Sequence, residues 1–117
     1  MKKFLAIYLG TPGGFEKWMA MDEKKRKALE AKGMAEWGQW MQTHSASVVD
    51  AGGPLGKTKR VAPGGVTDVR NAMTGYGVFS AESQEAAAKL FLGHPHFTVF
   101  PGECVEVMEI LPIPGQS

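Results

Sequence analysis

The run Phe4-Leu-Ala-Ile-Tyr-Leu9 constrains the fold of this chain more than any other feature. Alternate side chains of an extended segment point to opposite faces, so this run is apolar on both sides. Such a strand belongs in the middle of a sheet that is covered on both faces. The two preceding lysines resemble the start of a signal peptide, but the apolar run is short and ends in a Thr-Pro-Gly-Gly turn at 11–14 without a cleavage site.

Composition limits the class of protein. With 117 residues and 44% apolar content, the chain fits one domain over residues 1–117 with a single core. Thirteen basic and twelve acidic side chains leave a net charge of +1, which argues against a nucleic-acid partner, and we expect no membrane partner either. The single cysteine, Cys104, excludes an internal disulfide framework, and no Cys/His cluster has metal-ligand spacing. We therefore expect a cytoplasmic protein without a metal or a cofactor.

The periodicity of the apolar residues predicts the order of the elements. The patterned segments are, in chain order, a strand at 4–9, a helix at about 16–45, strands at 57–62 and 66–80, a helix at 84–92 and a strand at 104–111. Asn and Gly at 71–75 indicate an irregularity within the segment 66–80. Ser83 suits the N-cap of the second helix and Gly93 its C-cap. This order is that of the ferredoxin-like α+β unit, βαββαβ, an antiparallel sheet with both helices on one face.

The other face of such a sheet is left open. Here the last strand carries Cys104, Met108 and Ile110 opposite its valines, and the first strand is apolar on both sides. An exposed apolar area of that size marks an interaction surface. A second copy of the chain is the simplest cover, so we expect a homodimer whose sheets face each other as a dimeric α/β barrel.

Residues 51–58, Ala-Gly-Gly-Pro-Leu-Gly-Lys-Thr, match the relaxed form of a phosphate-binding P-loop. A P-loop opens a helix, whereas Pro63 and two glycines follow here, and no convincing downstream strand ends in the Asp that would help to hold magnesium. We interpret the stretch as a turn that leads into the strand at 57–62. The lysines and arginine of that strand suit a sheet edge, where charge discourages unwanted pairing.

Five segments in sequence resemble the YCII-related (DGPF) domain family. They are EWGQW at 36–40, DAGGPL at 50–55, GYGVFSAESQEAA at 75–87, HPHF at 94–97 and GECVEVMEI at 102–110. The resemblance implies a dimeric ferredoxin-like α/β barrel with a cleft between helices and sheet. It also implies a His-and-Asp pair as the suggested catalytic group of small members, and this sequence departs from that pair. The helical histidine falls near Glu36 or Trp37, and His94 stands where an acid is expected, while Asp50 and Glu106 match acids of the family pattern.

The candidate catalytic residues are His94, Asp50 and Glu106. His94 follows a helix C-cap, where the helix dipole favours imidazolium and raises the pKa, so beside a carboxylate it would act as a general acid or base. The structural alternative is a surface histidine that closes the helix. Glu106 has apolar neighbours on its strand face and needs a partner, so pocket function and pairing with Arg70 or a lysine of a second protomer stay equally open. Cys104 has no predicted base beside it and is expected to pack in the interior.

Further candidates line the helix and the Gly-Pro turn. Met34, Trp37 and Met41 recur at helical spacing, which is typical of a core, although a tryptophan at the edge of such a stripe can wall a pocket. His44 either caps the helix or touches Asp50. The predicted ligand-binding residues are Tyr8, Trp37, His44, Gly53, Pro54 and Tyr76.

The function expected from these residues is the binding of a small organic metabolite, with an anion as one option, in a cleft beside the DAGGPL turn and the HPH loop. In its enzymatic form, a histidine would transfer a proton without a cofactor, and Asp50 or Glu106 would orient it. The alternative is a non-catalytic module that senses a ligand or joins a larger complex. A His94→Gln variant with unchanged turnover would remove His94 as the proton-transfer group.

Overall fold

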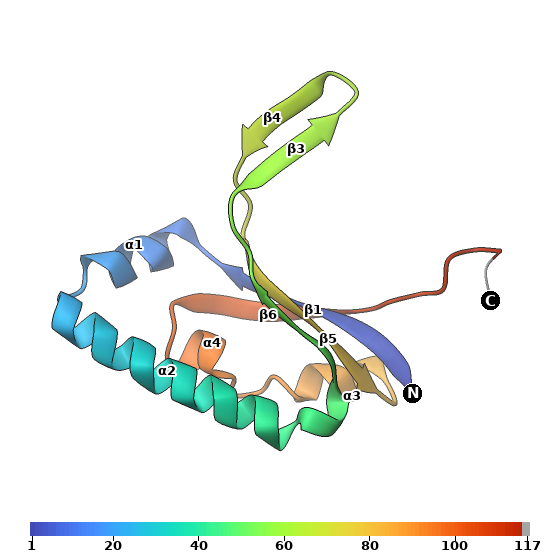
Figure 1. Ribbon diagram of the computed structural model, residues 1–117, viewed down its shortest axis with the longest axis horizontal. Helices are drawn as coiled ribbons and strands as arrows, with labels where there is room; N and C mark the ends of the chain where they lie inside the picture. The colour runs from blue at the N-terminus through green and yellow to red at the C-terminus, as the bar shows by residue number, and fades with distance from the viewer. Residues whose placement is uncertain (116–117) are drawn as a thin grey trace.

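The computed structural model describes residues 1–115 and has the predicted ferredoxin-like α+β fold (Figure 1). The main antiparallel sheet has the strand order β2-β5-β1-β6. Its strands are β1 (Lys2–Gly10), β2 (Val48–Pro54), β5 (Met73–Ala81) and β6 (Gly102–Glu109). The helices are α1 (Pro12–Ala20), α2 (Glu23–Thr43), α3 (Gln84–Lys89) and α4 (Pro95–Thr98), with a 3-10 turn, η1, at Ser45–Ser47. Helices α2, α3 and α4 lie on one side of the sheet (Figure 1).

The core lies between β1, β5 and these helices. Alternate side chains of β1 point into it, as predicted for a central strand. The buried residues that form the core include Phe4, Ala6, Tyr8, Trp40, Phe79 and Phe91. The indole Nε1 of Trp40 donates a hydrogen bond to the backbone carbonyl of Leu90 (3.0 Å), which fixes α2 to the end of α3. On the opposite face of β1, Leu5, Ile7 and Leu9 are only half-buried, because the described chain does not cover that side.

The predicted helix at 16–45 is wrong in its bounds, because two helices occupy the region and the first starts earlier. The Oγ1 atom of Thr11 accepts a hydrogen bond from the N–H of Gly14 (3.0 Å), so Thr11 caps α1. Pro12 takes the first helical position, where its missing N–H is not needed. The Thr-Pro-Gly-Gly stretch is therefore a helix start and not the predicted turn.

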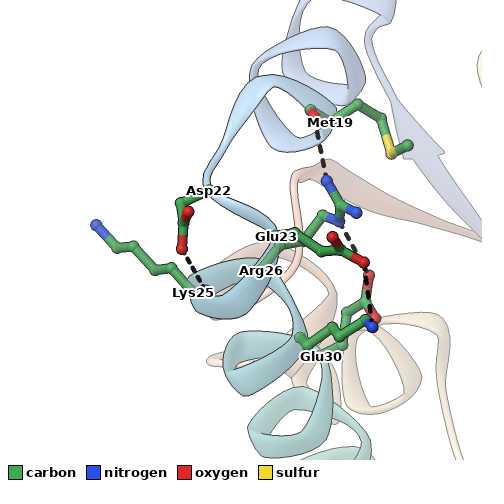
Figure 2. Close-up of polar contacts among 7 residues, drawn as sticks. Met19, Asp22, Glu23, Lys25, Arg26 and Glu30 are labelled. Atoms are coloured by element: carbon green, nitrogen blue, oxygen red, sulfur yellow. Dashed lines mark hydrogen bonds and ion pairs between the residues drawn. The ribbon is translucent and has the colours of Figure 1, made fainter.

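The break between α1 and α2 lies at residues 21–22 and is held by polar contacts (Figure 2). The Asp22 carboxylate accepts from the N–H of Lys25 (3.2 Å) and caps α2. The guanidinium of Arg26 donates to the Met19 carbonyl at the end of α1 (3.1 Å) and lies 3.7 Å from the Glu30 carboxylate. One arginine thus joins the last turn of α1 to the first turns of α2.

The prediction that 57–62 forms the edge of the main sheet is also wrong. Strand β3 (Thr58–Ala62) pairs with β4 (Gly65–Val69) in a separate two-stranded sheet, and the edge strands of the main sheet are β2 and β6. Residues 50–54 of the DAGGPL segment are part of β2, with register shifts against β5 between Val48 and Asp50 and between Asp50 and Gly53. These bulges allow a Gly-Pro segment to pair as a strand instead of turning. The irregularity predicted at 71–75 is confirmed, because β4 and β5 are separate strands on either side of 70–72 and β5 shifts register against β1 beside Gly75.

Gly33 and Gly38 both lie inside α2, but their surroundings differ. A Cβ atom added to Gly33 would lie 2.5 Å from the ring of Phe100, whereas one added to Gly38 would have nothing within 4 Å. Alanine is favoured over glycine in a helix by about 1 kcal/mol. Adding a methyl group to a site that is already filled lowers the free energy of unfolding by about 1–3 kcal/mol.

We therefore expect opposite effects from the same substitution at these two positions. Gly38→Ala should raise the free energy of unfolding by up to about 1 kcal/mol, and Gly33→Ala should lower it by about 1–2 kcal/mol because the Phe100 ring must move. Urea denaturation of both variants checks this. Equal stabilisation by the two alanines would mean that α2 and Phe100 are not in close contact.

Candidate functional site

A cleft of about 340 Å³ lies between α2, the β2–β5 edge of the sheet and the α4–β6 connection. Most of its wall is aromatic or aliphatic, with His96 as its one histidine. The lining residues are Tyr8, Met34, Trp37, Ala51, Gly53, Pro54, Thr74, Gly75, Tyr76, His96 and Phe100. A concave, largely apolar site with a few polar groups is the usual form of a small-molecule site.

His94, Pro95 and His96 form the start of the one-turn helix α4, which sequence analysis treated as a loop. The backbone N–H of His96 donates to Nδ1 of His94 (2.9 Å), so the His94 side chain is the N-cap of α4. Pro95 occupies the first helical position. The cap fixes the backbone from which the His96 side chain extends to the cleft wall.

The His96 ring is anchored to the sheet. Its Nε2–H donates to the backbone carbonyl of Leu9 (2.8 Å), and because a carbonyl can only accept, Nε2 carries the proton. Burial lowers the pKa of His96, while backbone hydrogen bonds at Leu9 and Cys104 act in the opposite direction. The ring is therefore neutral near pH 7, and Nδ1 is its unprotonated nitrogen.

His94 is the most enclosed polar side chain of the described residues. It is fully buried, and its ring centroid lies 4.4 Å from that of Trp37 and 4.6 Å from that of Trp40. Its Nε2 has no hydrogen-bond partner in residues 1–115. Burial, followed by the nearby His96 and His44, lowers the pKa of His94 to about 4. The expected surface histidine with a raised pKa is thus wrong, because packing against two tryptophans outweighs the end of the preceding helix.

Five of the six predicted ligand-binding residues line the cleft: Tyr8, Trp37, Gly53, Pro54 and Tyr76. Burial raises the pKa of Tyr8, which therefore stays a phenol that can donate a hydrogen bond. His44 ends α2 as its C-cap, and its ring centroid lies 4.7 Å from that of Trp40, so it takes the capping position and is not part of the cleft wall. The helical stripe divides between two environments: Trp40 is buried in the core, and Met34 and Trp37 line the cleft.

The structure does not bring His94, Asp50 and Glu106 together. Asp50 is in β2 and Glu106 in β6, the two edge strands, so β5 and β1 separate them by about 14 Å. Both carboxylates are exposed, and Asp50 accepts a hydrogen bond from the N–H of Gly52 (2.9 Å). His94 lies on the helical side of the sheet. No acidic side chain is in the wall of the 340 Å³ cleft, as far as the described residues show.

Sequence analysis missed His96, Thr74 and Phe100, which line the cleft. The signal for His96 was present in the His-Pro-His spacing, since a cap followed by proline starts a helix and projects the next residue from it. Cys104 is half-buried on the open sheet face, and burial together with Glu103 and Glu106 raises its pKa, so it remains a thiol. The raised pKa agrees with the expected lack of reactivity, but the expected packing in the interior is wrong, because Cys104 is only half-buried.

A larger cleft of about 1070 Å³ lies between α1 and the stem of the β3–β4 hairpin. Thr74, His96 and Phe100 line both clefts, so the two meet at His96. Lys57 and Arg70 place positive charge in the wall of the larger one.

Neither a protein-family model nor a curated protein sequence matches this chain. Among solved structures, the fold is similar to that of the 5-chloro-2-hydroxyhydroquinone dehydrochlorinase TftG from Burkholderia phenoliruptrix AC1100, in complex with 2,5-dihydroxybenzoquinone. The alignment covers 98% of this chain and 99% of that chain with a TM-score of 0.55, at 16% sequence identity. None of the described helices is long and apolar enough to cross a bilayer. At this level of identity, the match establishes a shared α+β fold with a four-stranded antiparallel sheet.

Proposed function

We propose that this protein binds a small, flat, oxygen-bearing ring compound in the His96 cleft and that His96 exchanges a proton with it. The observation that carries the proposal is a neutral histidine with a fixed tautomer in a cleft walled by aromatic rings. The rings of Tyr8, Trp37, Tyr76 and Phe100 offer stacking surfaces for a planar ligand. The hydroxyl groups of the two tyrosines supply hydrogen bonds for ring oxygens.

The ligand class is chosen with the help of the related fold. The dehydrochlorinase that shares this fold is described in complex with a dihydroxybenzoquinone. Hydroxyquinones are flat, carry oxygens at the ring edge and ionise easily, because the hydroxyl group is conjugated with a ring carbonyl. The cations Lys57 and Arg70 in the adjoining cleft suit such an anionic form. Membership of the YCII-related family and a cytoplasmic location are parts of the same proposal.

Proton transfer would use Nδ1 of His96 as the base. The carbonyl of Leu9 holds Nε2–H in place, which is the orienting role that a carboxylate has in a His-and-Asp pair. The lowered pKa of His96 keeps the base form available at neutral pH. One observation favours the alternative, a ligand sensor without turnover: no carboxylate is among the described residues of the cleft wall to stabilise an imidazolium.

A homodimer is the second part of the proposal, and the dimensions of the protomer support it. The accessible surface is 8263 Å², whereas a compact monomer of 12.6 kDa exposes about 6,200 Å². The radius of gyration is 16.3 Å against about 13 Å for a compact chain of this length. The excess of about 2,000 Å² is within the area that one subunit contributes to an obligate dimer. The open sheet face with Leu5, Ile7 and Leu9 is the surface that a second copy would cover.

Calorimetric titration with 2,5-dihydroxybenzoquinone tests the ligand proposal. We expect binding by the wild type, at least tenfold weaker binding by His96→Gln, and unchanged binding by His44→Gln, a matched histidine outside the cleft wall. The tenfold factor corresponds to about 1.4 kcal/mol, the scale of one hydrogen bond. Equal affinities of the two variants would remove His96 from the site.

The catalytic and sensing forms are distinguished by deuterium exchange. In D₂O, the deuterated Nδ1 of His96 would deliver a deuteron to the ring carbon beside the ionised hydroxyl of the bound dihydroxyquinone, which forms a keto tautomer. The freed Nδ1 would then remove the original proton from that carbon and restore the ionised dihydroxyquinone. Exchange that the wild type accelerates and His96→Gln does not is expected for proton transfer. Binding without accelerated exchange would favour the sensor.

A further inference from the structure

The β3–β4 hairpin stands apart from the rest of the molecule. Its two strands are joined by regular antiparallel pairing from Thr58↔Val69 to Ala62↔Gly65. Among the described residues, the only substantial contacts of either strand are with the other. The hairpin projects from the sheet away from α2 (Figure 1). An isolated two-stranded hairpin is at best marginally stable in water, so this one needs a surface to pack against.

The end of the hairpin carries an apolar pair. Val61 and Val66 are register partners, so their side chains share a face, and they are 78% and 64% exposed. Closer to the base, Lys59 and Asp68 form a cross-strand ion pair at 2.6 Å on the same face. Two β-branched residues side by side stabilise the pairing of the strands. At these exposures they also leave an apolar face at the end of the hairpin open for contact.

The position of the hairpin identifies the partner. The hairpin rises on the side of the sheet that the helices leave uncovered (Figure 1). The half-buried side chains of Leu5, Ile7 and Leu9 belong to the uncovered face of β1. A second copy seated on that face would lie next to the hairpin, and by two-fold symmetry each hairpin would reach the other protomer. We infer that the β3–β4 hairpin is a dimer arm that packs its Val61–Val66 face against the second copy of this chain. This inference rests on the dimer of the proposed function.

The arm also connects the dimer to the site. Residues of its stem, among them Lys57 and Arg70, form one wall of the 1070 Å³ cleft that meets the smaller cleft at His96. Within residues 1–115, the two strands of the hairpin make no substantial contact outside their own pair, so they hold such a wall loosely, and contact with the partner would fix it. The dimer thus sets the position of the two cations relative to His96.

The experiment compares the dimer dissociation constants of three proteins by sedimentation equilibrium. The Val61→Asp variant is expected to have a dimer dissociation constant at least tenfold higher than that of the wild type, because each of the two subunits brings the charge into the interface. Leu92→Asp is the matched control: Leu92 is 77% exposed, lies beyond α3 on the helical side, and its variant should stay within twofold of the wild type. A dimeric wild type with an unchanged constant in Val61→Asp would overturn the arm and leave the dimer intact.

A wild-type protein that is monomeric would contradict the proposed dimer and, with it, the proposed dimer arm.

A second measurement does not depend on a variant. Amide hydrogen exchange of residues 58–69 should slow as protein concentration rises through the dissociation constant. Exchange of these amides that is fast and independent of concentration in a proven dimer would contradict the arm.

Discussion

Met108→Asp is expected to convert the proposed homodimer into a monomer and to raise its dissociation constant by at least roughly 1,000-fold, or about 4 kcal/mol. Met108 lies on the open sheet face, where it is the register partner of Leu5 and shares the face with Glu106. It is 43% exposed in the protomer, so the substitution leaves the core unchanged. In the dimer, a carboxylate without a counter-ion would be buried in each subunit, and one uncompensated buried charge costs about 3–5 kcal/mol, so about 4 kcal/mol is the minimum for the two.

Sedimentation velocity measures this effect directly. The wild type should sediment as a species of twice 12.6 kDa and Met108→Asp as one of 12.6 kDa at the same micromolar concentration. Circular dichroism of the variant should keep the wild-type shape, because Met108 is outside the core. A variant that remains dimeric would mean that the open face is not the interface.

The second large effect is a loss of stability in acid that depends on His94. The pKa of His94 is about 4 in the folded protein, below the value of about 6.5 in an unfolded chain, so the unfolded state binds more protons between these values. The contribution of neutral His94 to the free energy of unfolding is fully present above about pH 6.5 and is lost as the pH falls through the pKa of the folded state. The difference between the folded and unfolded pKa values of His94 corresponds to a loss of about 3 kcal/mol in the free energy of unfolding. Protonation would also block Nδ1 and remove the cap of α4.

Urea denaturation between about pH 7 and pH 4 tests this in the wild type and in His94→Asn. Asparagine is a good N-cap and does not titrate, so the variant should be less stable at neutral pH because of lost packing but should lose about 2–3 kcal/mol less on acidification. Carboxylates titrate in the same range and contribute equally to both proteins. If the free energies of unfolding of the wild type and of His94→Asn fell in parallel with pH, His94 would not be buried in its neutral form.

The sequence predicted those parts of the fold whose signals are local. The two apolar faces of 4–9 correctly identified the central strand, and Ser83 correctly marked the start of α3, where its Oγ accepts from the N–H of Ala86 (3.1 Å). Pro and Gly were less informative, because the same residues begin helices, end them and form turns. Thr11-Pro-Gly-Gly14 was therefore misread as a turn. The charges of 57–62 indicated a strand but not which sheet it joins, since that depends on contacts distant in sequence.

The sequence predicted the candidate site about as completely as it predicted the fold. The Gly-Pro segment, Trp37 and the two tyrosines were predicted as ligand-binding residues of one cleft, and they line one cleft. The choice between His94 and His96 required tertiary information. Both flank Pro95, and only the packing of His94 against Trp37 and Trp40, with the bond from His96 to the Leu9 carbonyl, distinguishes the buried cap from the ring in the cleft wall.

The central claim is that the cleft carrying His96 is the ligand site, and the ring nitrogens test it most directly. The chain has three histidines, so a ¹⁵N–¹H spectrum of the imidazoles resolves each ring. Before ligand is added, His96 should appear as a neutral ring with its proton on Nε2. Saturating 2,5-dihydroxybenzoquinone should shift the Nδ1 resonance of His96 and leave His44 unchanged. A ligand that binds without moving any His96 resonance would contradict the account.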